Sequence, residues 1–216
     1  MKRLLKVTLS LLCVLSMTGC GSKRDDNIST DKNNTKVTEK KESKTGKSKY
    51  FDDFDKNVKL KSAVYSIYVP NNTHAYDDSG SNLFEMESID EKCVNAILLS
   101  SGVYDEESEN LKIENIDALL STRKINGMSG MYSTTKYDLN VENSKILKLQ
   151  KYEGMYKYGQ LTIDEKPFNC VEFSFVLHEE DDEKDLCELI IVSDDYEEKD
   201  LKNIAEELIS QIHETK

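Results

Sequence analysis

The clearest hydrophobic pattern in this chain is a stripe of aliphatic residues close to its C-terminus. The stripe comprises Leu201, Ile204, Ala205, Leu208, Ile209 and Ile212. Spacings of three and four residues place these side chains on one face of a helix, with charged residues on the other face. The acidic stretch at 194–198 precedes the stripe, where the helix dipole favours negative charge. The pattern predicts an amphipathic closing helix that packs on the rest of the domain.

Upstream of this helix, period-two alternation and short apolar runs predict strands. The expected strands are residues 63–69, 82–88, 93–99, 131–137, 145–152, 155–163, 168–177 and 186–192. The last of them is apolar at both alternating sets of positions, so we expect it to lie at the centre of a sheet. Gly154 is predicted to form a turn, and the acidic run at 179–183 is predicted to be the tip of a hairpin.

One further helix is expected at residues 115–124, where apolar residues recur at helical spacing. Asn126 and Gly127 are predicted to end it. The resulting order is three strands, a helix, a run of strands and a final helix. This order predicts an α+β domain with a mainly antiparallel β-sheet and helices packed on it, an α/β/α sandwich.

The N-terminus carries a different pattern. Three cations within the first six residues precede an apolar stretch at 7–17, which is about eleven residues long and within the usual range of a signal peptide. A membrane-spanning helix needs roughly 20 apolar residues. The stretch ends in Met17-Thr18-Gly19-Cys20, which resembles the bacterial lipobox. That resemblance implies cleavage between Gly19 and Cys20 and a diacylglyceryl anchor on the Cys20 thiol. The alternative is an ordinary signal peptide with a chance cysteine.

Residues 20–49 are rich in Ser, Thr, Asn, Asp and Lys and contain no aromatic residue. Such a segment buries too little apolar surface to offset its ordering entropy, so we interpret it as a disordered tether behind the lipidated Cys20. Residues 50–216 are long enough for one domain with its own core. The expected organisation is a signal peptide at 1–19, the tether, and a single extracytoplasmic domain.

Charge divides at the same boundary. Residues 1–50 carry a net charge of +7 and residues 51–216 a net charge of −19, within a whole-chain value of −12. Nucleic-acid affinity depends largely on neutralised phosphates, so a domain this acidic is not expected to bind nucleic acid. The basic tether should instead be attracted to anionic lipid headgroups.

Three segments of the domain resemble the PsbP-like family, which includes the extrinsic photosystem subunit and the Ran-binding Mog proteins. Tyr65-Ser66-Ile67-Tyr68-Val69-Pro70 resembles the opening strand of that family, 161–168 resembles the turn before its late hairpin, and 186–212 resembles its closing strand and helix. The resemblance implies an α/β/α sandwich. It also implies a protein that binds partners or assists assembly rather than one that catalyses.

Cysteine usage predicts no disulfide scaffold. Cys13 would leave with the signal peptide and Cys20 would be lipidated, so Cys93, Cys170 and Cys187 remain. Two states of these cysteines are possible: one disulfide with one free thiol, or three buried thiols. Each of the three is flanked by apolar residues and is interpreted as a small core hydrophobe.

Five patterns suggest chemistry, and each has a structural alternative that we favour. His178-Glu179 lacks the second histidine of a zinc helix, and the acidic run after it lacks the glycine of a calcium loop. The sequence at 127–131 resembles the Gly-x-Ser-x-Gly nucleophile elbow, but its fifth residue is Met131 and a predicted helix, not a strand, precedes it. Cys187 and His178 lie on different arms of one predicted hairpin. Tyr152, Tyr156 and Tyr158 form an aromatic cluster that is better explained by core packing. No catalytic residue, metal ligand or cofactor is therefore assigned.

The sequence thus leaves two functional hypotheses. The first is a non-catalytic binding or assembly module, held on the membrane by Cys20, whose partner is an envelope protein. The second is a solute-binding or envelope-modifying lipoprotein. A deep pocket with convergent polar groups would favour the second hypothesis.

Overall fold

The computed structural model describes residues 48–60, 64–78, 81–104, 111–133, 137–180 and 183–215. All of them belong to one compact unit, Lys44–Lys216. The predicted signal peptide, its cleavage site at Gly19, the lipidation site Cys20 and the predicted tether up to residue 47 lie outside the described residues.

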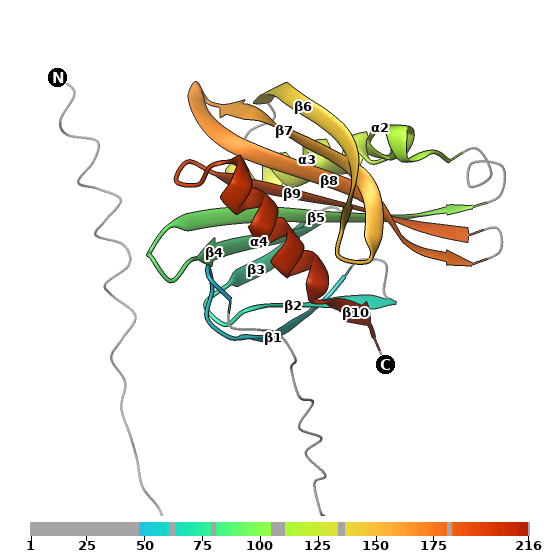
Figure 1. The fold of residues 1–216 in the computed structure, drawn as a ribbon, viewed down its shortest axis with the longest axis horizontal. Coiled ribbons are helices and arrows are strands. Elements are labelled where there is room, and N and C mark those ends of the chain that lie inside the picture. Colours follow the sequence, from blue (N-terminus) through green and yellow to red (C-terminus); the bar gives the residue numbers. More distant parts are fainter. Residues whose placement is uncertain are drawn as a thin grey trace, which may run out of the picture. The chain divides into compact units, whose positions relative to one another are not determined.

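The strands assemble into two antiparallel sheets (Figure 1). In chain order they are β1 (Phe54–Lys59), β2 (Tyr65–Pro70), β3 (His74–Asp78), β4 (Ser81–Glu87), β5 (Cys93–Tyr104), β6 (Tyr137–Leu149), β7 (Tyr152–Ile163), β8 (Lys166–Glu180), β9 (Glu183–Ser193) and β10 (Ile212–Glu214). The larger sheet has the order β3-β4-β5-β9-β8-β7-β6 and the smaller one the order β1-β2-β10. The prediction of a mainly antiparallel sheet with helices packed on it is confirmed.

Helices lie on both faces of the larger sheet. Helix α4 (Glu198–Ser210) packs on β8 and β9 on one face, which it shares with the smaller sheet. On the other face lie a short 3-10 helix, η1 (Ile113–Asn115), helix α2 (Ile116–Leu119) and helix α3 (Ser121–Tyr132), with α3 over β4 and β5. In Figure 1, α4 crosses in front of the strands while α2 and α3 lie behind them. Two hydrophobic cores result, one on each face.

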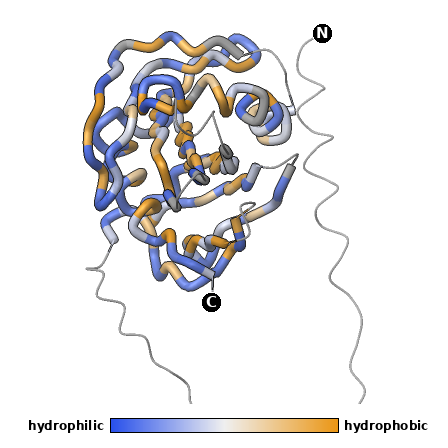
Figure 2. Tube along the Cα trace, turned by 90° about the vertical axis from the view of Figure 1, so that its right-hand side faces the viewer, coloured by the Kyte–Doolittle hydropathy of each residue, from blue (hydrophilic) through white to orange (hydrophobic). Residues whose placement is uncertain are grey.

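Strand β9 supplies both cores, as its sequence predicts. Leu189 and Ile191 point into the core under α4, whereas Ile190 and Val192 point into the core under α3. Hydrophobic and hydrophilic residues are interspersed along the chain trace (Figure 2). Since β9 lies between β5 and β8, the prediction of a central strand at 186–192 is confirmed.

The closing helix ends at Ser210, two residues before the last residue of the apolar stripe. Leu201, Ile204, Ala205, Leu208 and Ile209 are buried on α4. Ile212 belongs instead to β10, where it pairs with Ile67 of β2 and still contributes to the same core. A helical spacing was therefore shared by a helix and the short strand that follows it.

The prediction that Gly127 ends a helix is wrong. Helix α3 continues through this residue to Tyr132, and β6 begins only at Tyr137. A Cβ atom at Gly127 would lie 2.8 Å from the Cγ2 atom of Ile97, so glycine lets α3 approach the sheet closely. Residues 131–132, predicted as the start of a strand, are instead the last two residues of α3.

The predicted turn at Gly154 is also wrong. The chain turns instead at Gln150 and Lys151, because Leu149 pairs with Tyr152 across the hairpin. Gln150 has a positive φ of 55°. Gly154 lies inside β7, where a Cβ atom would collide with the carbonyl oxygen of Ser174 and the ring of Phe173. This glycine therefore serves close packing between β7 and β8 and not a turn.

Candidate functional site

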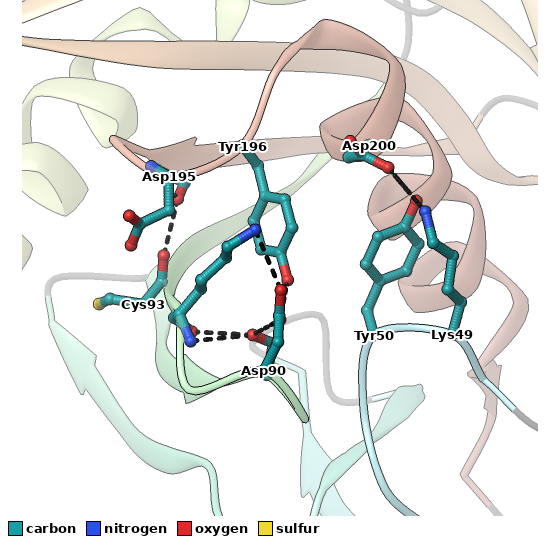
Figure 3. Close-up of polar contacts among 10 residues, drawn as sticks. Lys49, Tyr50, Asp90, Cys93, Asp195, Tyr196 and Asp200 are labelled. Carbon is teal, nitrogen blue, oxygen red and sulfur yellow. Dashed lines mark hydrogen bonds and ion pairs between the residues drawn. The ribbon is translucent and has the colours of Figure 1, made fainter.

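The first described residues of the chain are held against α4 by polar contacts. The Tyr50 hydroxyl donates to Oδ1 of Asp200 over 2.6 Å and accepts a hydrogen bond of 3.1 Å from Nδ2 of Asn203. The Lys49 ammonium lies 3.1 Å from the same Asp200 oxygen, as Figure 3 shows. The Ser48 hydroxyl donates to Glu207 one turn further along the helix. We name this set of contacts the clasp; it comprises Ser48, Lys49, Tyr50, Asp200, Asn203 and Glu207.

Local geometry explains why the chain enters the domain at this point. The backbone N–H groups of Tyr50 and Phe51 both donate to the Ser48 hydroxyl, over 3.1 and 3.0 Å, and so form a tight turn. Both aromatic side chains are buried, with exposed fractions of 3% and 1%. Burial of two aromatic rings outweighs the ordering of a short segment.

A second polar group lies beside the clasp and joins it to two loops (Figure 3). The Tyr196 hydroxyl, from the loop before α4, donates to Asp90 in the turn between β4 and β5. The Lys92 ammonium lies 4.4 Å from the centroid of the Tyr196 ring. The Tyr50 and Tyr196 rings meet edge to face at 5.7 Å. Three segments that are far apart in sequence are thereby fixed to one another.

These contacts favour the ionised form of both aspartates. The Tyr50 hydroxyl, and after it the Lys49 ammonium, lower the pKa of the Asp200 carboxyl. Hydrogen bonds from Tyr196, Ser88 and Lys92 hold the pKa of Asp90 well below its ordinary value. Both carboxylates are therefore charged throughout the neutral range.

A buried ion cluster lies on the opposite face of the sheet. The ammonium of Lys124, on α3, lies 3.0 Å from Glu172 of β8 and 2.8 Å from Glu188 of β9. The side chains of the three residues are 13%, 3% and 0% exposed. Ser174 donates a further hydrogen bond of 3.2 Å to Glu188. Desolvated charges of this kind need partners, and here each charge has one.

The cluster keeps its lysine protonated. Burial alone would lower the pKa of Lys124, but the carboxylates of Glu188 and Glu172 outweigh that effect and raise the pKa above its ordinary value. A lysine that acts as a nucleophile or base needs the opposite shift. The nearby thiol of Cys170 is fully buried, and burial raises its pKa. The arrangement stabilises α3 on the sheet rather than preparing a reactive group.

Two acidic residues in the strand patterns point to this cluster, which was not among the predicted sites. Glu188 interrupts a strand that is apolar at both alternating sets of positions, so its side chain is directed into a core, whereas Glu172 lies on the more polar face of the neighbouring strand. A carboxylate buried on a central strand requires a cation beside it. The clasp was missed because Ser48 and Lys49 have the composition of the preceding segment, although the aromatic pair at 50–51 marks the point where the chain enters the core.

The residues singled out from the sequence for chemistry are separated in the structure. Cys187 pairs with Phe175 across the sheet, whereas His178 pairs with Asp185 beyond a bulge in β8. The Cys187 thiol is buried, and burial raises its pKa, so it stays protonated. Ser129 lies within α3, and His178 lies in a strand rather than on a helix.

The aromatic cluster is part of the core, as we favoured. Tyr152 and Tyr156 are 7% and 0% exposed, and Tyr158 packs against the core under α4. Cys93, Cys170 and Cys187 are free thiols. The interpretation of Cys93 as a core residue is wrong, because it is exposed at the start of β5.

Within the described ranges, no group of three or more histidine, cysteine, aspartate or glutamate side chains could hold a metal ion. Among the same residues, no helix is both long enough and apolar enough to cross a membrane.

No protein-family model matches the chain, and no curated protein sequence matches it. Its fold is similar to those of several solved structures, among them the following three. Cyanobacterial PsbP (CyanoP) from Synechocystis sp. PCC 6803 is 10% identical with a TM-score of 0.47, over 74% of this chain and 92% of that one. LpqN, involved in cell envelope biogenesis of Mycobacterium tuberculosis, is 11% identical with a TM-score of 0.42, over 70% and 83%.

The third structure is a protein from Bacteroides thetaiotaomicron VPI-5482. It is 15% identical with a TM-score of 0.42 over 76% of this chain. The match spans only 49% of that protein, about half of its length.

Proposed function

We propose that this chain is a lipoprotein that is anchored by a diacylglyceryl group on Cys20 and that acts outside the cytoplasmic membrane. Its role is to bind or help assemble another envelope protein, without catalysis. The charged N-region, the apolar stretch of signal-peptide length and the lipobox-like Met17-Thr18-Gly19-Cys20 support the anchor. Two acyl chains suit stable attachment, since one chain binds a membrane only marginally.

The clasp is the observation that carries this proposal. The hydrogen bond between Tyr50 and Asp200 fixes the segment that follows the predicted tether to the first turn of α4. An anchor at Cys20 would therefore be connected to the domain at a defined point on α4. A module that must present one face to a partner benefits from a fixed point of attachment.

The direction of the pKa shifts supports binding over catalysis. Asp90 and Asp200 are shifted toward more acidic pH, and Lys124 toward more alkaline pH. Burial raises the pKa values of the Cys170 and Cys187 thiols. General acids and bases are tuned in the other direction, toward the working pH.

We further propose that the domain is a PsbP-like α/β/α sandwich. The segments that resemble that family fall in β2, in the hairpin of β7 and β8, and in β9 with α4. A family of non-catalytic partner-binding domains accords with the proposed role.

The anchor is tested with two cysteine variants of the full chain expressed in a bacterium. Cys20→Ser should abolish the diacylglyceryl group and cleavage after Gly19, and the protein should leave the membrane fraction as an unlipidated form. Cys13→Ser, in the predicted signal peptide, is the matched control and should be processed normally. Mass spectrometry of the mature N-terminus decides between the outcomes, and a wild-type protein that begins at any other residue would refute the proposal.

The binding role is tested by cross-linking the wild-type lipoprotein in intact membranes and purifying it. Recovery of one envelope protein in stoichiometric amount, absent from the Cys20→Ser sample, is the expected result. If thermal-shift screening instead identifies a small solute that stabilises the purified chain, the alternative of a solute-binding lipoprotein is correct.

A further inference from the structure

Strand β6 forms one outer edge of the seven-stranded sheet. It is 13 residues long, and it pairs with β7 on one side only among the described residues. The opposite edge, β3, has only five residues. An edge strand presents unpaired N–H and C=O groups that can accept another strand.

Two exposed apolar side chains lie on the same face of this edge. Val141 pairs with Gly159 and Ile146 pairs with Met155, and both of these β7 positions belong to the face that α3 covers further along the sheet. Their side chains are 42% and 46% exposed. The bulge between Val141 and Asn143 is what brings an odd-numbered and an even-numbered residue to one face.

The two apolar residues are placed symmetrically about Ser144. Ser144 pairs with Lys157 of β7, and the partners of Val141 and Ile146 lie two residues on either side of Lys157. An antiparallel copy of β6 with Ser144 on the two-fold axis would set Val141 of each copy opposite Ile146 of the other. Directly opposed residues share a face in an antiparallel pair, and apolar pairs of this kind stabilise a sheet.

The polar residues of the edge fit the same register. Asn143 and Lys145 pair with Tyr158 and Tyr156, one residue on either side of Lys157, so each Lys145 would face an asparagine of the other copy and not a second lysine. Like charges directly opposite one another would destabilise the pair. An arrangement in which both copies use the same edge closes after two chains.

We propose that β6 is a docking edge for a second copy of this chain, which joins the two large sheets into one through the contact of Val141 with Ile146. The association is independent of the lipid anchor and of the envelope partner proposed above. Residues 51–216 carry a net charge of −19, so two domains repel each other and salt screens that repulsion. Dimerisation should therefore strengthen with salt. The rival occupant of this edge is an acidic peptide bound beside Lys145 and Lys148, and salt would weaken its binding because it screens the attraction.

Sedimentation of the full chain carrying Cys20→Ser, over a range of concentrations and salt, tests the association. Ile146→Lys should weaken it by about tenfold or more, because each substitution alters both copies of the contact. Ile89→Lys, at an isoleucine that is 50% exposed in the turn between β4 and β5, is the matched control and should leave it unchanged.

A covalent test fixes the register. In the Cys20→Ser chain with Cys13 and Cys93 also replaced by serine, Ser144→Cys should form a disulfide-linked dimer on mild oxidation, because the two-fold axis passes between the two thiols. Lys148→Cys, on the same edge but displaced from the axis, should not. A chain that stays monomeric up to about 1 mM, a dimer that Ile146→Lys leaves intact, or equal cross-linking by the two cysteine variants would each overturn the proposal.

Discussion

The ammonium of Lys124 lies 2.8 Å from the carboxylate of Glu188, and the glutamate side chain has no solvent exposure. Lys124 comes from α3 and Glu188 from the central strand β9, so one ion pair connects the helix to the middle of the sheet. Glu172 on β8 provides a second carboxylate at 3.0 Å. The position of α3 thus depends on a charge as well as on apolar packing.

Replacement of Lys124 by methionine should destabilise the domain by about 3–5 kcal/mol, because two desolvated carboxylates would lose their counter-charge. Urea unfolding at neutral pH measures the change. Lys202→Met, which removes the more exposed ion pair of Lys202 with Glu206 on α4, should change stability by less than about 0.5 kcal/mol.

The same ion pair should give a signature at alkaline pH. The folded-state pKa of Lys124 is raised above its unfolded value of about 10.4, so its contribution to stability is complete below that pH. The contribution is lost as pH rises through the folded-state pKa. Lys124→Met should therefore lose less stability than the wild type as pH rises above about 10.4, and parallel curves over that rise would contradict a charge-based role.

Gly127→Ala should destabilise the domain although alanine is the better helix former. The added Cβ atom would lie 2.8 Å from Cγ2 of Ile97, and overpacking of this kind costs about 1–3 kcal/mol. The gain in helix propensity is at most about 1 kcal/mol. Asn126→Ala, at the preceding and more exposed position of α3, should be neutral or stabilising. If both variants gain stability in urea unfolding, α3 does not approach the sheet as closely as described.

Leu208→Ala tests the packing of α4. Leu208 is fully buried, so truncation should cost about 2–5 kcal/mol through lost transfer energy and a cavity. Lys202→Ala, on the more exposed face of the same helix, should cost less than about 0.5 kcal/mol. Equal unfolding midpoints for the two variants would refute a helix packed on the sheet.

Periodic patterns predicted the parts of the fold whose side chains are buried on one face. The stripe from Leu201 to Ile209 and the alternation of Val171, Phe173 and Phe175 are both observed in the cores. Strand β1 was missed because Asp55, Lys56 and Asn57 give it a polar composition, although it pairs with β2.

The errors at Gly127 and Gly154 share one cause. A glycine that allows two elements to approach closely has the same local sequence as a glycine that ends a helix or makes a turn. Only the partner, Ile97 in one case and Ser174 in the other, distinguishes these roles, and the partner is distant in sequence. The clasp and the Lys124 cluster likewise depend on pairings between distant segments.

Acidification should weaken the polar contacts beside α4. The folded-state pKa values of Asp90 and Asp200 are lowered, so their contributions are present above the unfolded value of about 3.9 and are lost as pH falls through the folded values. Asp90→Asn and Asp200→Asn should each be less stable than the wild type at pH 7. The difference should shrink below about pH 4. Unfolding curves at both pH values measure it, and a deficit that is equal at the two would contradict a role for the charge.

Limited proteolysis tests where the domain begins. The composition of residues 21–47 predicts rapid cleavage by trypsin at the lysines of that segment. Lys49 should resist, although its side chain is 73% exposed, because trypsin must bind the extended backbone on both sides of the cut. Tyr50 and Phe51 are buried, and their N–H groups are bonded to Ser48. Mass spectrometry should therefore find a stable core that begins at Ser48.

Opening the clasp should move that boundary. Asp200→Ala removes the acceptor shared by Lys49 and the Tyr50 hydroxyl, so cleavage after Lys49 should become rapid and the core should begin at Tyr50. Lys202→Ala, on the same helix outside the clasp, should leave the boundary at Ser48. If the wild-type chain is already cut after Lys49 as fast as after Lys47, the segment is not held by α4 in solution. The fixed attachment point that carries the proposed function would then be lost, whatever the state of Cys20.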